Sequence, residues 1–310
     1  MIIARPSPQQ APYALRALYT VAASDGDLDP RELQLIELGI DVLGADLSIA
    51  DLTPITPEEV AEAIPEQDIR EAMLQRMVLI SMMDETIAPE EITTMQAFAK
   101  ALGVKERAIK NMKQVMDGHL KRMSFDLGRR SFARQILRKV WKEEGLKGFW
   151  QIAKTALGRV DEAVAQRSQA LGELPEGTLG HAYFQFMRSN DFALPGEKYG
   201  PPDFVMFHDI GHVLGGYPTT PQGEVQIAGL QAGYMGEDGF TMTLFIILLF
   251  HMGQNIRPGV EATTGMFDLD AFRKAFEAGK GMNTNLVTWD PWPHMERPLD
   301  EVRAELNLTV

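Results

Sequence analysis

An acidic stretch that occurs twice in the first third of the chain decides the fold class. Residues 24–32 read SDGDLDPRE, and 59 residues later residues 83–91 read MDETIAPEE. Each copy follows an apolar segment (13–23 and 69–83), places a Pro in the first turn of the next segment, and ends that segment with Leu-Gly. In both second segments, apolar residues recur at spacings of two to four, as one face of a helix requires. The repeat therefore predicts a pair of helical hairpins.

The rest of the chain extends this prediction to an all-α protein of two helical domains. No β-branched runs or Gly-rich phosphate loops occur. Residues 119–159 carry 11 basic and 3 acidic side chains, whereas the segments on either side carry net charges of −10 and −11. We therefore predict a helical repeat domain over 1–118, a basic amphipathic helical connector over 119–168 and a second helical domain over 169–310.

Composition excludes several classes of function. The chain has no Cys, which excludes disulfides, thiolate nucleophiles and Cys-ligated zinc or iron–sulfur clusters. The overall charge of −13 argues against nucleic-acid binding, because the phosphate backbone would be repelled outside the basic connector. The N-terminus resembles neither a signal peptide nor a transit peptide, and the longest apolar stretch, 240–250, is about half of the length that spans a membrane. We expect a cytoplasmic protein with a buried helix at 240–250.

The carboxylates of the repeated turns have two interpretations. Asp25, Asp27 and Asp29 have the spacing of a calcium loop, but an EF-hand needs Glu at the twelfth position, where Ile36 stands. The turns could still hold a hard cation, and they could equally serve as helix caps. The residues concerned are Asp25, Asp27 and Glu32 in the first copy and Asp84, Glu85 and Glu91 in the second.

Helical hairpins with a D-x-x-(L/I)-x-x-x-E turn in each half resemble the tellurite-resistance TerB-like domain over residues 10–118. The resemblance implies an all-helical acidic module that acts in sensing or scaffolding, with a metal site at the turns. The second copy departs from the first at Glu85, Thr86 and Ala88, so a second cation site is the weaker expectation.

The connector mixes aromatic and basic residues on one amphipathic stretch. Between 131 and 157 the apolar set includes Trp141 and Trp150, interleaved with six Lys and Arg side chains. Such a helix binds an anionic bilayer by inserting its apolar side, and it can equally pack against an acidic domain. We keep an anionic membrane surface as the predicted partner of 131–157.

A metal site is predicted in the second domain. His208 and His212 stand one helical turn apart, Asp209 lies between them, and Glu224 follows after eleven residues at the start of an apolar helix. Both imidazoles can reach one divalent cation, and the carboxylate can supply an oxygen. Asp209 is either a fourth ligand or a carboxylate that fixes a histidine tautomer. Two nitrogens with carboxylate oxygen suit Zn and equally Fe or Mn. The remaining histidines are interpreted as structural: His119, His181, His251 and His294.

The segment from about 170 onward resembles the fourth protein of the coenzyme Q (ubiquinone) biosynthesis series. Three blocks carry the resemblance: LPEGTLG at 174–180, His208-Asp209-x-x-His212-x(11)-Glu224, and PLDEVR at 298–303. It implies that His208, Asp209, His212 and Glu224 ligate a divalent metal. It also implies a peripheral position on the bacterial inner membrane and work on a polyprenylated quinone precursor beside other ubiquinone-biosynthesis proteins.

The implied chemistry is replacement of the ring C1 carboxylate of a 4-hydroxybenzoate-derived precursor by hydroxyl, an oxidative decarboxylation. The alternative is a non-catalytic, lipid-binding scaffold that organises the biosynthetic enzymes. Two departures bear on the choice: His181 follows Gly180, and apolar residues 204–207 precede His208, where the family carries basic residues that would bind the substrate's carboxylate. A homodimer is compatible with either expectation.

Overall fold

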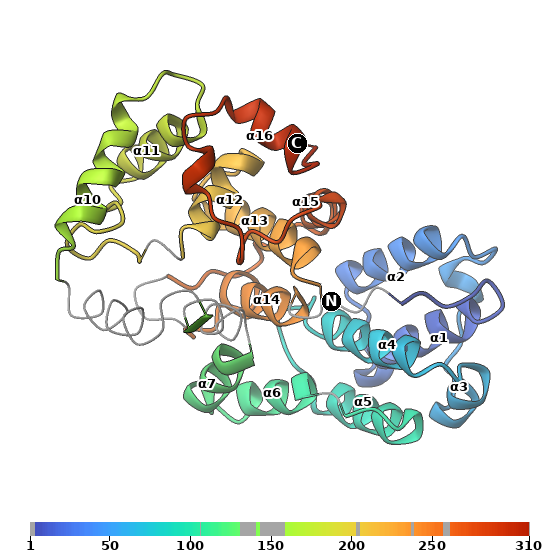
Figure 1. The fold of residues 1–310 in the computed structure, drawn as a ribbon. Coiled ribbons are helices and arrows are strands. Elements are labelled where there is room, and N and C mark those ends of the chain that lie inside the picture. The colour runs from blue at the N-terminus through green and yellow to red at the C-terminus, as the bar shows by residue number, and fades with distance from the viewer. Residues whose placement is uncertain are drawn as a thin grey trace. The chain divides into compact units, whose positions relative to one another are not determined.

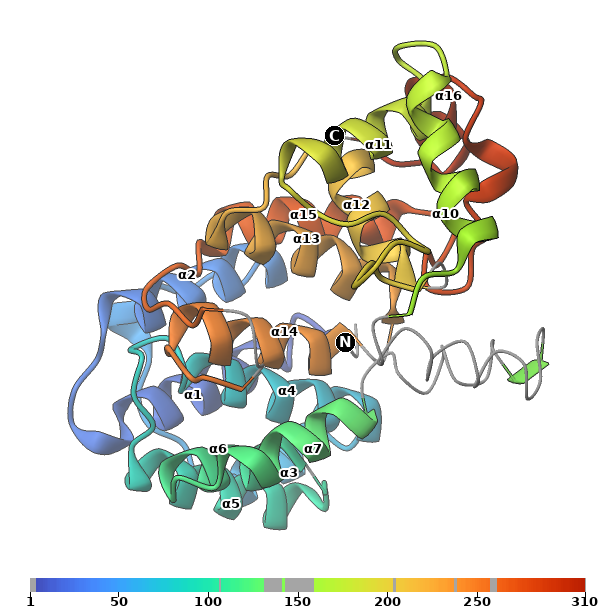
Figure 2. The same ribbon diagram turned by 90° about the vertical axis from the view of Figure 1, so that its left-hand side faces the viewer.

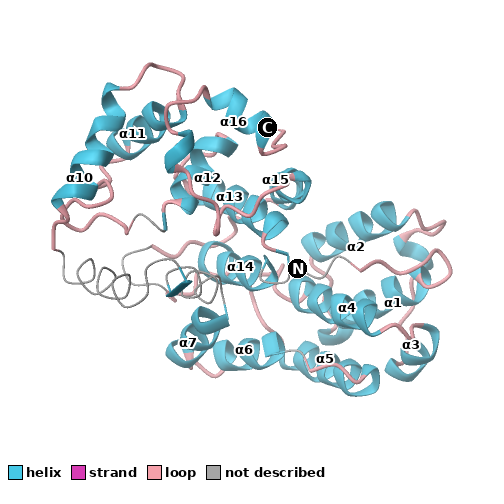
Figure 3. Cartoon of the chain, viewed as in Figure 1, coloured by secondary structure: helices cyan, strands magenta, loops and turns pink. Residues whose placement is uncertain are grey.

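The computed structural model describes residues 4–105, 107–130, 141–142, 159–202, 205–236, 239–256 and 261–309. Over these residues the regular structure is helical, with no strand (Figure 3). Two isolated bridges, Thr178 with Pro298 and Met252 with Thr264, are the β-type pairings found there. The predicted all-α class is confirmed. None of the helices in this part of the chain combines the length and apolar composition that a membrane-spanning segment needs.

Contacts within the chain group it into two compact units. Unit 1 comprises Met1–Leu127 and Leu244–Leu269, and unit 2 comprises Gly128–Thr243 and Asp270–Val310. Segment 244–269 therefore groups with the N-terminal helices, although the sequence placed it in the domain over 169–310. The three predicted domain ranges stay a prediction.

Unit 1 is built from the predicted helical repeat (Figure 1). Its helices are α1 (Ala11–Ala22), α2 (Pro30–Leu43), α3 (Pro57–Ala63), α4 (Gln67–Ile80), α5 (Pro89–Leu102), α6 (Arg107–Met116) and α7 (Leu120–Arg130). Both predicted hairpins form: α1 leads through an acidic turn into α2, and α4 leads through its counterpart into α5. The Pro at the first turn of α2 and α5, and the left-handed Gly44 and Gly103 that end them, confirm the boundaries expected from the sequence.

Segment 244–269 adds a buried element to unit 1. Helix α14 (Gly239–Ile246) continues into a π-helical turn, Ile247–His251, so the run predicted as a buried core helix is helical and almost wholly buried. His251 is fully buried, and its Nε2 lies 2.9 Å from the carbonyl oxygen of Met83, at the turn before α5. This hydrogen bond ties the segment to the second acidic turn.

Unit 2 contains α10 (Glu162–Gln169), α11 (Leu179–Ser189), α12 (Phe207–Gly215), α13 (Pro221–Tyr234), α15 (Leu269–Gly281) and α16 (Leu299–Glu305) (Figure 2). Its core includes Tyr183 of α11, Ile210 of α12, Ile227 of α13 and Val302 of α16. Glycine allows α13 and α15 to pack closely, because a Cβ at Gly279 would lie 2.0 Å from the carbonyl oxygen of Leu230. This packing fixes α13, which carries part of the predicted metal site.

The connector prediction is only partly covered by the structure. The amphipathic stretch 131–157 lies outside the described residues except for Trp141 and Lys142, both of which are exposed. The membrane contact predicted for this stretch stays a prediction.

Candidate metal centre

Helix α12 presents two histidines from one of its faces. His208 and His212 are four residues apart, so their side chains lie one above the other, with ring centroids 4.9 Å apart. The helix ends at Gly216 in the left-handed conformation. Within the helix, Gly211 lets α13 approach closely, since a Cβ there would lie 2.6 Å from Cδ1 of Ile227. A side chain at this position would have to displace the end of the Ile227 side chain.

A tight turn brings α13 back beside α12. Thr220 caps α13 by accepting a hydrogen bond from the Gly223 N–H, and Pro221 occupies the first turn. Gly223 is required because a Cβ there would lie 1.9 Å from the carbonyl oxygen of Pro218. Glu224 therefore stands in the first turn of α13, where the predicted apolar helix begins, and its carboxylate faces both histidines.

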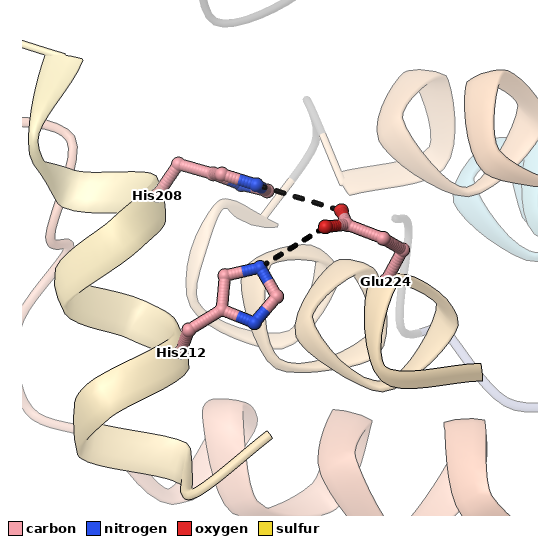
Figure 4. Close-up of side chains that lie close together, drawn as sticks. All are labelled: His208, His212 and Glu224. Carbon is pink, nitrogen blue, oxygen red and sulfur yellow. Dashed lines mark ion pairs between the residues drawn. The ribbon is translucent and has the colours of Figure 1, made fainter. Parts of the chain in front are cut away.

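The three side chains converge at their metal-binding atoms (Figure 4). His208 Nε2 lies 3.5 Å from one carboxylate oxygen of Glu224, and His212 Nε2 lies 3.4 Å from the other. One ligand atom from each residue falls within 4.8 Å of the other two. Ligands about 2.1 Å from a tetrahedral zinc ion lie roughly 3.4 Å from one another. The group has the spacing and the donor types to hold a metal ion.

Burial differs across the three ligands. The side chain of His212 is 1% exposed, that of Glu224 is 22% exposed and that of His208 is 36% exposed. His212 Nε2 is buried and makes no hydrogen bond, an arrangement that costs free energy unless the nitrogen finds a partner. A cation bound between these groups would satisfy this nitrogen, while His208 leaves the group partly open to solvent.

The carboxylate is held in its charged form. Burial of Glu224 opposes ionisation, but the facing imidazoles of His208 and His212, when they carry a proton on Nε2 in the metal-free chain, outweigh it and lower the pKa to about 2. Glu224 is therefore an anionic oxygen donor at neutral pH.

Each histidine is oriented through its other ring nitrogen. His212 Nδ1 lies 3.1 Å from the carbonyl oxygen of Tyr217. Because a carbonyl only accepts, Nδ1 carries the proton and Nε2 keeps its lone pair for a metal. His208 Nδ1 lies 3.0 Å from the side-chain amide nitrogen of Gln231. Turning that amide over presents its oxygen instead, so Gln231 can stabilise the same tautomer in His208.

Sequence reasoning missed Gln231. It lies seven residues after Glu224 on α13, two helical turns along the same face, and it is 1% exposed. A buried Gln on the helix face that bears a predicted ligand is the signal that would have found it.

Replacing Gln231 is expected to weaken metal binding without removing a ligand. We expect Gln231→Leu to lower zinc affinity by about 10- to 100-fold, because His208 loses the group that fixes its ring and tautomer. Competitive titration against a chromophoric zinc chelator measures the change. Gln226→Leu, at a half-exposed position on the same helix, is the matched control and should bind zinc as the wild type does. Equal affinity in the two variants would show that Gln231 does not support His208.

Neighbouring elements of unit 2 brace the pair of helices. Phe186 of α11 stacks on the His212 ring, with centroids 5.4 Å apart and planes at 23°. Arg303 of α16 donates hydrogen bonds to the carbonyl oxygens of Leu214 and Val213, the last turn of α12. In the sequence, Arg303 stands out only as the last residue of the block 298–303. In the structure it contacts the helix that carries both histidines and so helps to position them.

Asp209 lies outside the group of three. It is on α12 between the two histidines, but no atom of it completes the cluster of ligand atoms within 4.8 Å. Its negative charge adds to burial in raising the pKa of the Tyr183 hydroxyl well above its ordinary value. The structure therefore brings together three of the four predicted ligands, His208, His212 and Glu224, and leaves Asp209 out of the group.

The acidic turns of unit 1 form capping interactions. Glu32 accepts a hydrogen bond from the Asp29 N–H and completes a capping box at the start of α2. Glu91 accepts from the Ala88 N–H at the start of α5, where Ala88 has no side-chain acceptor to complete the box. Asp25 and Asp84 accept from the backbone N–H groups of Asp27 and Thr86. Among the described residues, no three of Asp25, Asp27, Glu32, Asp84, Glu85 and Glu91 gather their ligand atoms within 4.8 Å. The cation site predicted there stays a prediction.

Both capping glutamates are deeply buried. Glu32 is 3% exposed and Glu91 is 2% exposed. Burial, with a smaller contribution from nearby carboxylates that include Asp84 and Asp25, raises the pKa of each to about 8. The carboxyls therefore favour the protonated form, which links the stability of the repeat to pH.

Comparison with known proteins assigns no family to the chain. No protein-family model matches it, and no curated protein matches it significantly. What the residues establish is an all-α chain with a His208–His212–Glu224 group that could hold a metal ion.

Proposed function

We propose that the protein is a metal-dependent member of ubiquinone biosynthesis that converts a polyprenylated 4-hydroxybenzoate-derived ring by oxidative decarboxylation. The observation that carries the metal part is the pair of imidazole Nε2 atoms facing one ionised carboxylate, with His212 Nε2 buried and without a hydrogen bond. Two nitrogens and one oxygen with an open side favour zinc, and they also suit Fe or Mn. A bound divalent ion supplies Lewis-acid polarisation of a coordinated oxygen, and a redox-active ion also supplies oxygen chemistry.

The three sequence blocks behind the resemblance pack together in unit 2, which supports assigning them to one site. The backbone of 177–180 bonds to that of 295–299: Leu179 N–H donates to Arg297 and Leu299 N–H donates to Gly177. Arg303 in turn contacts the last turn of α12. Residues more than 80 positions apart in sequence are thus joined around the helix that carries the histidines.

In the proposed reaction the ring C1–carboxylate bond breaks and the carboxyl group leaves as carbon dioxide. One atom of dioxygen becomes the new hydroxyl, and the other is reduced to water by two electrons from an external donor. His208, His212 and Glu224 would hold the ion, the Tyr217 carbonyl and Gln231 would set the tautomers, and Phe186 stacks on the His212 ring. The partly exposed His208 lies on the side from which the ring would enter.

A non-catalytic, lipid-binding scaffold is the second candidate. The observation that favours it concerns the residues directly before His208. Met206 and Phe207 are buried apolar side chains there, where the resemblance implies a basic residue that binds the substrate. Under this proposal the site binds the precursor and presents it to other biosynthetic enzymes.

One experiment separates the two. Metal-loaded full-length protein is mixed with a prenylated 4-hydroxybenzoate, dioxygen and a reductant, and carbon dioxide, the hydroxylated ring and the protein-bound precursor are measured. We expect turnover by wild type and by the control His119→Ala, and none by His212→Ala. Precursor binding without turnover in all three proteins would support the scaffold. Neither binding nor turnover by the wild type would contradict both proposals.

A further inference from the structure

Charge is segregated within unit 1. Residues 5–104 contain 6 Lys and Arg against 18 Asp and Glu, whereas residues 105–127, which end this N-terminal segment of unit 1, contain 6 Lys and Arg against 3 Asp and Glu. Five of these last six basic residues fall on α6 and α7, the consecutive green helices of Figure 2. Basic residues therefore outnumber acidic ones at the end of the segment, although the segment as a whole is acidic.

Helix α6 separates its basic and apolar side chains onto opposite faces. Ala108, Ile109 and Met112 are buried. Arg107, Lys110 and Lys113 are exposed and recur every three residues, and Met116, at the end of the helix, is 41% exposed. The exposed side chains of α6 therefore include three cations and one apolar residue.

Helix α7 repeats this arrangement with an aromatic residue. Met123 is fully buried, whereas Phe125 is 74% exposed. Lys121 and Arg122, both exposed, stand four and three residues before Phe125, so they flank its ring on the outer face. A large apolar side chain between two cations, open to solvent, is the composition of a helix that lies in a lipid interface.

The acidic residues in this stretch do not cancel the charge. Asp126 accepts a hydrogen bond from the buried Asn111, which holds its carboxylate to the side of α6. Asp117 stands in the turn between the two helices. The face formed by Arg107, Lys110, Lys113, Met116, Lys121, Arg122 and Phe125, here called the α6–α7 face, keeps five exposed cations and two exposed apolar side chains.

We propose that the α6–α7 face docks unit 1 on an anionic lipid bilayer, with Phe125 inserted among the head groups and the five cations over lipid phosphates. Charge complementarity favours this occupant, because an anionic surface repels the acidic remainder of unit 1 and attracts this face alone. An apolar ring that is three-quarters exposed also gains by leaving water, which a purely electrostatic contact would not provide. Docking here does not depend on the metal site, and its residues differ from the predicted connector contact over 131–157.

Vesicle co-sedimentation of the full chain tests this docking. Wild type is compared on phosphatidylcholine vesicles and on vesicles that also contain phosphatidylglycerol, at low and high salt. We expect binding only to the anionic vesicles and loss of binding in high salt. Lys121→Ala/Arg122→Ala should lower the partition coefficient by about 30-fold, since each cation at an anionic surface contributes about a factor of five. Phe125→Ala should lower it by about 10-fold through lost apolar burial.

The matched control is Tyr199→Ala in unit 2. Tyr199 is 76% exposed, and Lys198 Nζ lies 5.1 Å from its ring centroid, so it offers the same pairing of an aromatic with a cation. Its removal should leave vesicle binding unchanged, and circular dichroism should show that all variants fold. The assignment is overturned if the wild type does not bind anionic vesicles. That result would be expected if the α6–α7 face bound an acidic protein instead. The assignment is also overturned if Lys121→Ala/Arg122→Ala and Phe125→Ala still bind fully, because the lipid contact would then lie elsewhere in the chain.

Discussion

Replacing His208 and His212 together with alanine is expected to abolish stoichiometric metal binding. The change removes two of the three donors and leaves Glu224 without the imidazoles that face it at 3.5 and 3.4 Å. Affinity should fall by more than about 100-fold, since even the loss of a residue that only orients a ligand costs about 10- to 100-fold. Elemental analysis of the purified proteins measures the metal bound per chain.

Thermal unfolding supplies an independent readout of the same loss. A ligand present at 100 times its dissociation constant stabilises the native state by about 2.7 kcal/mol. A chelator should therefore lower the melting temperature of the wild type and of His119→Ala, the control, but not that of the double variant. A double variant that retains one metal ion per chain would place the site elsewhere.

The second large effect concerns the buried carboxyls of unit 1. The folded-state pKa of Glu32 and of Glu91 is about 8, above the ordinary value of 4.5. The folded state therefore holds protons that the unfolded state has released between these pH values. This contribution to stability is fully present below about pH 4.5, falls as the pH rises, and is lost above about pH 8.

Glu91→Gln should remove much of this pH dependence. Glutamine keeps an oxygen that accepts the Ala88 N–H but has no proton to lose. We expect the variant to be more stable than the wild type at pH 9, on the order of 2–5 kcal/mol, and similar to it at pH 5. Urea unfolding at the two pH values, followed by far-ultraviolet circular dichroism, measures the difference.

Glu90→Gln is the matched control for this effect. Glu90 is the adjacent residue on α5 and is exposed. Its replacement should leave the change in unfolding free energy between pH 5 and pH 9 as in the wild type. If Glu91→Gln kept the same pH dependence as Glu90→Gln, the buried carboxyl would not be protonated in the folded chain.

Local signals in the sequence predicted much of the fold. Pro30 and Pro89 marked the starts of α2 and α5, and Gly44 and Gly103 marked their ends, because these residue types satisfy the backbone at helix termini. The spacing of His208 and His212 also predicted that both lie on one face of α12, because residues four apart in a helix are one turn apart.

Long-range contacts were not predictable in the same way. The bond from His251 to Met83 joins residues 168 positions apart, and it accompanies the grouping of segment 244–269 with the N-terminal helices. Gln231, the carbonyl of Tyr217 and Arg303 support the histidines through the packing of α12 against α13 and α16. No periodicity or motif encodes such pairings, because they depend on how helices meet. The same packing leaves Asp209 outside the ligand group that the spacing had suggested.

X-ray absorption spectroscopy of the zinc-loaded full-length protein tests the metal site most directly. We expect two imidazole nitrogens and one carboxylate oxygen bound to the zinc at about 2.0–2.2 Å, with a further light ligand on the open side. In His212→Ala the signal of one imidazole should disappear. Zinc bound by fewer than two imidazoles in the wild type, or by an unchanged set of ligands in His212→Ala, would contradict a site built from His208, His212 and Glu224.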